Sequence, residues 1–172
     1  GKEFEISGKI IAEVLREFKG LRHRLEFVRE LNGVKYYNDS FATTPETSMA
    51  AVDSFDQPTV LIAGGSEKNH DFGNWAEKIL TKASLVTVIL IGDTAEKMEK
   101  ALIEAEKKFG SARTTPTRVL RRKDLDEAIL EAYTEAKDGS VIVMSPACAS
   151  FDQFKNYKER GDTFWQIVAS LN

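Results

Sequence analysis

Residues that could bind an anion gather near the end of the chain. Residues 141–144 have the apolar pattern of a buried strand, and the run Ser145-Pro-Ala-Cys-Ala-Ser-Phe-Asp-Gln-Phe-Lys-Asn156 follows them. We predict that this run leads into a helix whose first backbone N–H groups stay free, where the helix dipole favours a negative charge. The pattern therefore predicts a small carboxylate or phosphate ligand at this corner.

Two other predicted strands also end in polar residues. The run Asn38-Asp-Ser-Phe-Ala-Thr-Thr-Pro45 follows residues 34–37, and Gly64-Gly-Ser-Glu-Lys-Asn-His-Asp-Phe72 follows residues 59–63. Ligands of open α/β sheets bind beyond the carboxyl ends of the strands, so we expect all three runs to meet at one edge. A fourth strand end, Ile91-Gly-Asp93, is typical of an ordinary turn into a helix capped by Asp93, and we interpret it as structural.

Taken singly, these polar residues allow more than one interpretation. Lys68 could hold an anion as a point charge, although loop lysines are usually only solvated. Asp39 could shape a turn or contact a ligand or magnesium. Cys148 as a nucleophile, with His23 or His70 as its base, is the weaker alternative to a small buried cysteine. Neither Gly64-Gly65 nor any other segment matches the glycine-rich nucleotide fingerprints.

The elements that must position these residues alternate along most of the chain. Asn32-Gly33 favours a tight hairpin turn between strands at 24–29 and 34–37. Further strands are expected at 59–63, 85–91, 117–120 and 140–144, and helices at 8–18, 45–55, 71–83, 93–109, 123–137 and the C-terminus. This order predicts an α/β fold, with a doubly wound, Rossmann-like, mostly parallel sheet, an antiparallel hairpin at its entry and helices on both faces.

Composition narrows the function classes. The 172 residues are 42% apolar and 30% charged, which favours one substantial core. A net charge of −3 without a basic block argues against nucleic acid as a partner. No stretch approaches the roughly 18 apolar residues of a membrane span, so we expect no membrane partner. The single cysteine excludes an internal disulfide and favours a cytoplasmic protein.

Together the motifs resemble the C-terminal domain of the Mur ligases, and among these the branch that adds D-glutamate to the peptidoglycan precursor. The similarity extends from about residue 8 to the end and would correspond to about the last third of such an enzyme. The matching motifs are Gly20-Leu-Arg-His-Arg-Leu-Glu26, Asn32-Gly-Val34, Asn38-Asp-Ser-Phe-Ala-Thr43, Gly64-Gly-Ser-Glu-Lys68 with Asp71-Phe72, and Ser145 to Asn156 with Arg160-Gly161.

The resemblance implies a D-glutamate pocket on this chain. Lys68 and Thr43 would hold one carboxylate of D-glutamate. Ser150, with the backbone around Phe151 and Tyr157, would hold the other. The corner after residue 144 would then be half of a carboxylate pocket.

The resemblance also implies roles in catalysis with ATP. His23 and Arg24 match a His-Arg pair near an interdomain hinge, where the arginine reaches the ATP phosphates, and Asp39 matches an aspartate on the nucleotide side. ATP and Mg²⁺ would be held mainly by domains that precede this chain, as would the second substrate, UDP-N-acetylmuramoyl-L-alanine. We expect no metal site on the chain itself and no turnover by the chain alone.

Two positions depart from the family pattern. Phe41 stands where the D-glutamate branch usually has lysine, and Arg22 stands where the family often has proline. An alternative is therefore a Mur-type domain for a different amino acid; a stand-alone binding module and a Cys148-dependent hydrolase are further alternatives. We expect residues 1–20 to form a hinge segment, residues 21–172 to form the amino-acid-binding domain, and the protein to be a monomer.

Overall fold

The computed structural model describes residue 4 and residues 6–18, 20–109 and 116–172. Within these ranges six strands form one sheet in the order β1-β2-β6-β3-β4-β5. Only the pair β1–β2 is antiparallel. The predicted α/β sheet with an antiparallel entry is therefore confirmed. The strands are β1 (Glu26–Leu31), β2 (Val34–Asn38), β3 (Thr59–Gly64), β4 (Leu85–Ile91), β5 (Arg118–Arg121) and β6 (Val141–Met144).

The predicted hairpin turn is present between β1 and β2. Asn32 and Gly33 have φ angles of 51° and 74°, and Leu31 pairs with Val34 across the turn. Positive φ at both central residues is the requirement of the tight hairpin turn that matches strand twist, and Asn-Gly meets it at low cost. The turn sets the register of β2, and through it the place of Asn38 at the sheet edge.

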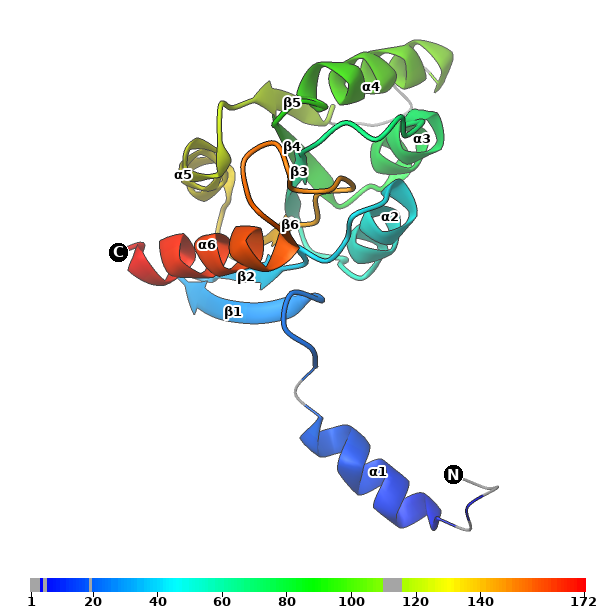
Figure 1. Cartoon of the computed structure of the whole chain (residues 1–172), viewed down its shortest axis with the longest axis vertical. Helices are drawn as coiled ribbons and strands as arrows, with labels where there is room; N and C mark the ends of the chain where they lie inside the picture. The colour runs from blue at the N-terminus through cyan, green and yellow to red at the C-terminus, as the bar shows by residue number, and fades with distance from the viewer. Residues whose placement is uncertain (1–3, 5, 19, 110–115) are drawn as a thin grey trace.

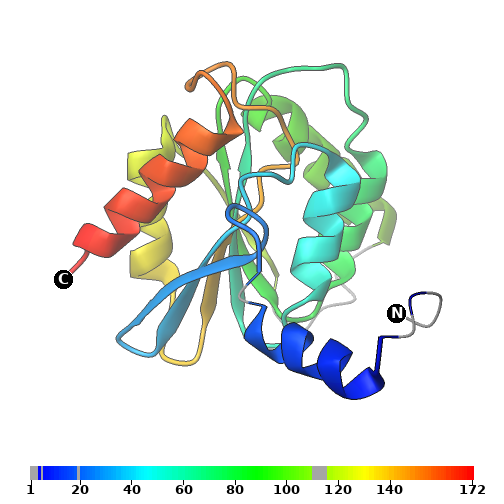
Figure 2. The same cartoon turned by 60° about the horizontal axis from the view of Figure 1, so that its bottom comes forward.

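Helices cover both faces of the sheet (Figures 1 and 2). Leu61 and Ala63 of β3 pack on one side, and Val60 and Ile62 pack on the other. This division follows from the two-residue period of a strand. One side carries α2 (Pro45–Asp53), α3 (Gly73–Thr81) and α4 (Ala95–Phe109), and the other carries α5 (Leu125–Glu135) and α6 (Tyr157–Ser170).

The first helix, α1 (Gly8–Glu17), lies apart from the sheet in Figure 1. Ser7 caps it by accepting a hydrogen bond from the Ile10 N–H. None of its residues is buried, although it carries apolar side chains at helical spacing. The helix itself was expected from this spacing, whereas the domain boundary at residue 20 stays a prediction.

No helix in the described part of the chain is long and apolar enough to cross a membrane.

Candidate functional site

The three polar strand ends meet at one edge of the sheet, as the sequence predicted. Strand β6 lies between β2 and β3. The Asp39 N–H donates to the Met144 carbonyl at 2.9 Å, which joins the end of β2 to the end of β6. The Ser66 N–H donates to the Ala149 carbonyl at 2.9 Å, which joins the loop after β3 to the loop after β6. These two hydrogen bonds join residues that lie more than 80 positions apart in the sequence.

The loop after β6 is not the open helix start that the sequence suggested. Helix α6 begins only at Tyr157, and the Asn156 side chain accepts hydrogen bonds from the Lys158 and Glu159 N–H groups. Asparagine is among the strongest N-cap residues, so it occupies the donors that were expected to be free. Ser150, 2% exposed, accepts from the Phe154 N–H through its carbonyl. The Lys158 and Glu159 N–H groups are therefore not free, and the expectation of an uncapped helix start is wrong.

Arg160 is the centre of this edge, and its role was not foreseen. It is 1% exposed and donates to the Ser40 hydroxyl and carbonyl at 3.0 and 2.9 Å. It also donates to the carbonyls of Cys148 and Ala149 at 3.0 and 3.2 Å. Burial lowers the pKa of Arg160 to about 10, so the guanidinium still carries its charge at neutral pH. We call this set of four bonds the Arg160 tie, because it fastens the loop after β2 to the loop after β6.

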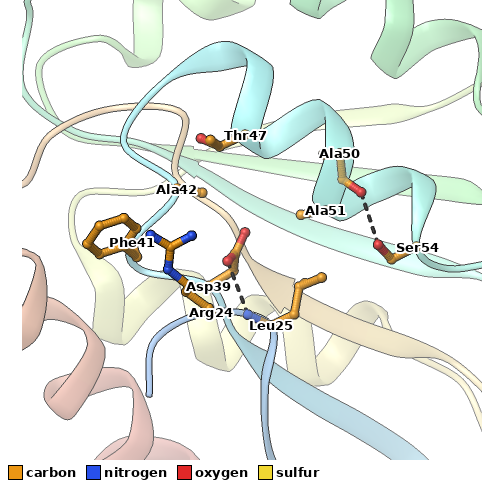
Figure 3. A pocket seen from close by; sticks show the side chains of 9 residues that line it. All are labelled: Arg24, Leu25, Asp39, Phe41, Ala42, Thr47, Ala50, Ala51 and Ser54. Atoms are coloured by element: carbon orange, nitrogen blue, oxygen red, sulfur yellow. Dashed lines mark hydrogen bonds between the residues drawn. The ribbon is translucent and has the colours of Figure 1, made fainter. Parts of the chain in front are cut away.

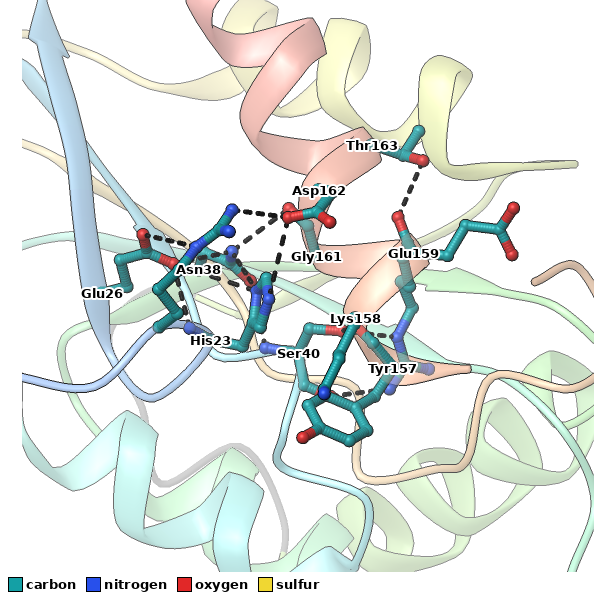
Figure 4. Close-up of polar contacts among 12 residues, drawn as sticks. His23, Glu26, Asn38, Ser40, Tyr157, Lys158, Glu159, Gly161, Asp162 and Thr163 are labelled. Atoms are coloured by element: carbon teal, nitrogen blue, oxygen red, sulfur yellow. Dashed lines mark hydrogen bonds and ion pairs between the residues drawn. The ribbon is translucent and has the colours of Figure 1, made fainter. Parts of the chain in front are cut away.

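His23 is packed beside the Arg160 tie. A side chain at Gly161 would place its Cβ 2.2 Å from His23 Nδ1, so only glycine lets the imidazole approach α6. The Asn38 amide lies 3.0 Å from His23 Nδ1 and donates to the Gly161 carbonyl (Figure 4). Burial lowers the pKa of His23 below its ordinary value, and the nearby Asp162 opposes that shift. His23 is 5% exposed, and its predicted catalytic role stays a prediction.

A cavity of about 290 Å³ opens between the start of β1 and helix α2 (Figure 3). Arg24 and Asp39 contribute its charges. Asp39 accepts hydrogen bonds from the Leu25 N–H at 3.1 Å and the Ser145 hydroxyl at 2.7 Å, which fix the carboxylate. Burial raises the pKa of Asp39, against those two bonds and the charge of Arg24. The remaining lining residues are Leu25, Phe41, Ala42, Thr47, Ala50, Ala51 and Ser54.

Aromatic rings join Arg24 to helix α6. The Arg24 guanidinium carbon lies 4.0 Å from the centroid of the Phe41 ring. The Phe41 ring in turn meets the Tyr157 ring edge to face, with centroids 4.7 Å apart. The ring of Phe41 thus links two of the predicted site residues, Arg24 and Tyr157. Phe41 itself was noted in the sequence only as a departure from the family pattern.

Lys68 lies on a separate part of the same edge. Its ammonium is 5.2 Å from the centroid of the Phe151 ring, and Phe151 is 64% exposed. Within the described ranges the Lys68 ammonium has no hydrogen bond or ion pair, and none joins it to Thr43. An ammonium that has no hydrogen-bond or ion-pair partner among the described residues, and that lies at the edge of a parallel sheet, is suited to pair with a carboxylate.

Cys148 faces the protein interior. It is fully buried, and its thiol lies 3.2 Å from the hydroxyl of Thr94. Burial raises the pKa of Cys148 to about 11, which keeps it as the unreactive thiol. These observations oppose the nucleophile interpretation.

The fourth strand end packs against this interior. Thr94, which also donates to the Gly65 carbonyl, precedes α4, whose first residue is Ala95. At the turn around Gly92 the hydroxyl of the buried Thr94 makes the side-chain hydrogen bonds, and Asp93 donates its backbone N–H to the Asp152 carboxylate. The local sequence did not indicate whether Asp93 or Thr94 would make these contacts. No cluster of His, Cys, Asp or Glu that could hold a metal ion occurs in the described part of the chain.

Comparison with known proteins identifies the family. The family model described as "Mur ligase, glutamate ligase domain" matches residues 23–148, which is more than half of the chain. The chain belongs to the Mur ligase family. The match includes the cavity residues and Lys68, whereas the Arg160 tie is completed by α6 outside it.

Two curated Mur ligases illustrate the similarity. The chain is 42% identical to the UDP-N-acetylmuramoylalanine--D-glutamate ligase of Caldicellulosiruptor saccharolyticus over 98% of its own length and 35% of the relative's. It is 41% identical to the ligase of the same name from Pelotomaculum thermopropionicum over 99% of its length and 35% of the relative's. The chain therefore spans about a third of the length of the curated relatives that it matches.

Solved Mur ligase structures share the fold. The murein peptide ligase of Psychrobacter arcticus superposes with a TM-score of 0.56 at 16% identity, over 99% of this chain and 35% of that one. The MurF ligase of Thermotoga maritima, in complex with ADP, gives a TM-score of 0.55 at 14% identity, over 89% of this chain and 33% of that one. At these identities the likeness concerns the fold alone.

Proposed function

We propose that this chain is the amino-acid-binding domain of a longer ATP-dependent ligase that joins D-glutamate to UDP-N-acetylmuramoyl-L-alanine in peptidoglycan precursor synthesis. The observation that carries the proposal is the 42% identity to a D-glutamate ligase over 98% of the chain. The geometry of the sheet edge supports it, because the loops after β2, β3 and β6 are fastened together there.

D-glutamate, in this proposal, lies along the outer part of the edge. Lys68 and Thr43 hold one carboxylate, and Ser150 with the backbone around Phe151 and Tyr157 holds the other. The unpaired Lys68 ammonium supports this assignment, because a carboxylate would supply the partner that the described residues do not. The Ser66–Ala149 bridge supports it too, since it brings the loop of Lys68 beside the loop of Ser150.

ATP, in this proposal, is bound mainly by the preceding domains together with Mg²⁺, and its phosphates are approached by Arg24. The cavity that Arg24 shares with Asp39 supports a role at the nucleotide. An arginine suits phosphate because its planar fork offers several donors at once. His23, which directly precedes Arg24 in the chain, is proposed to act with it in catalysis. The protein would act as a cytoplasmic monomer.

In this reaction the task of the domain is to position D-glutamate. ATP transfers a phosphoryl group to the terminal alanine carboxylate and leaves as ADP, and the D-glutamate amine then attacks the acyl phosphate. The C–N bond forms as phosphate departs, and the amine loses its proton. Two fixed carboxylates orient the amine of D-glutamate toward the acyl carbon, and such positioning accounts for a large part of catalysis in reactions of this type.

An amino-acid screen of the full-length protein tests the function. ATP consumption is measured with UDP-N-acetylmuramoyl-L-alanine and each of several amino acids, and D-glutamate is expected to give the highest rate. L-glutamate serves as the matched control, because it has the same charges with the opposite hand. A higher rate with another amino acid would support the alternative that Phe41 marks a changed specificity, and would overturn the assignment to D-glutamate.

A further inference from the structure

Phe41 lies between a cation and a second aromatic ring. Its ring faces the Arg24 guanidinium at 4.0 Å and meets Tyr157 edge to face at 4.7 Å, with the two ring planes 89° apart. Both geometries are favourable, because the negative face of a ring attracts a cation and the positive edge of one ring attracts the face of another. The orientation of Phe41 is therefore determined from two sides.

The Phe41 ring is the contact that the structure shows for the Arg24 guanidinium. Arg24 is exposed, and in the part of the chain that the structure describes its guanidinium makes no hydrogen bond and no ion pair. Asp39 is nearby, but its two oxygens already accept from Leu25 and Ser145. In Figure 3 the guanidinium lies beside the Phe41 ring in the wall of the cavity. Because the contact with the ring uses none of the N–H groups in a hydrogen bond to the described residues, these donors are available to a ligand.

We propose that Phe41 is a positioning residue, which holds the Arg24 guanidinium so that its N–H donors are presented to the phosphates of the nucleotide. The inference rests on the proposed function, because that function supplies ATP as the ligand of Arg24. Phe41 puts no charge beside Arg24, so the arginine is oriented without repulsion from a neighbouring cation. Through Tyr157 the same ring connects Arg24 to the first turn of α6.

The test uses the full-length enzyme with Phe41→Leu and Phe41→Tyr. Leucine keeps the apolar character but removes the ring, and we expect the KM for ATP to rise about threefold to tenfold, as loss of a cation–π contact implies. Tyrosine keeps the ring and is expected to restore the wild-type KM. The KM for D-glutamate should change less than the KM for ATP. Thermal unfolding midpoints of all variants confirm that the fold is retained, and Phe41→Met replaces leucine if that variant does not fold.

A double-mutant cycle with Arg24→Gln separates positioning from a general loss of packing. We expect Phe41→Leu to have almost no further effect on the KM for ATP once Arg24 is removed, because the ring then has no guanidinium to hold. An equal effect in both backgrounds, or a tyrosine variant no better than leucine, would overturn the proposal.

Calorimetry with a non-hydrolysable ATP analogue on the same variants measures how Phe41 changes the affinity for the nucleotide, without turnover. A wild-type enzyme that binds the analogue but consumes no ATP with D-glutamate would refute the proposed function while leaving the inference about Phe41 open to the same cycle. Unchanged analogue affinity in Phe41→Leu would refute the inference alone.

Discussion

Two arginines at the same edge of the sheet have opposite surroundings. Arg160 is 1% exposed and donates to the main-chain oxygens of Ser40, Cys148 and Ala149. Arg24 is exposed, donates no side-chain hydrogen bond within the described residues, and rests on the ring of Phe41. The first has its hydrogen-bonding capacity occupied by the protein, and the second has it available. Whether the N–H donors are already occupied, more than the residue type, therefore separates an arginine that holds the site together from one that is available to a ligand.

The same distinction applies to the rest of the edge. Cys148 is buried next to the Arg160 tie, whereas Lys68 and Phe151 lie on the outside. Substitutions on the inside should therefore change stability, and substitutions on the outside should change ligand binding.

Arg160→Met gives the largest expected effect on stability. It removes the donor of the Ser40 and Cys148 carbonyls, and each unsatisfied buried group costs about 1–3 kcal/mol. The Ala149 carbonyl keeps its hydrogen bond from the Ser66 N–H. We expect a loss of at least about 3 kcal/mol in the free energy of unfolding, measured by urea denaturation. Arg24→Met is the matched control and should cost less than about 1 kcal/mol. Equal losses for the two variants would remove the distinction between the arginines.

Lys68→Ala tests the outside of the edge. In the full-length enzyme we expect the KM for D-glutamate to rise about tenfold to a hundredfold, because the carboxylate loses a charged partner. The unfolding midpoint should stay close to that of the wild type. Lys100→Ala, which removes an exposed lysine paired with Glu96 on α4, is the control and should leave KM unchanged. Normal saturation by D-glutamate in Lys68→Ala would contradict the pocket assignment.

The smallest expected effect is a pH-dependent loss of stability caused by the Cys148 thiol. The thiol has a pKa of about 11 in the folded protein against an ordinary value of 9.0. Between these values the unfolded chain releases the thiol proton and the folded chain keeps it, so stability falls as pH rises. By pH 10 the loss should reach about 1 kcal/mol relative to pH 8. Denaturation at both pH values, compared with Cys148→Ala, measures it; the same pH dependence in both proteins would argue against a buried thiol.

Much of the fold was predictable because its signals are local. The hairpin turn needs only Asn32-Gly33, helix α2 needs only Thr44 before Pro45, and the apolar runs mark the strands. The meeting of three strand ends followed from the general geometry of parallel sheets.

The part of the site that the sequence did not predict depends on contacts between residues far apart in the chain. The Arg160 tie joins Arg160 to Ser40 across 120 residues, and no local pattern indicates which carbonyls a buried arginine will bind. The stack of Arg24 on Phe41 was missed for the same reason, since the two residues belong to different segments. The start of α6 was misjudged because the Asn156 cap competes with the expected ligand for the same N–H groups.

The distance in sequence between Ser40 and Arg160 also has a consequence for synthesis. A chain emerging from the ribosome presents the loop after β2 long before the residue that fastens it has been made. The hairpin and the central strands can begin to pair during that interval, because their contacts do not need α6. The binding edge, in contrast, reaches its final shape only after α6 has been made. A premature stop before residue 160 would yield a sheet whose ligand edge lacks the Arg160 tie, so the site forms later than the sheet that carries it.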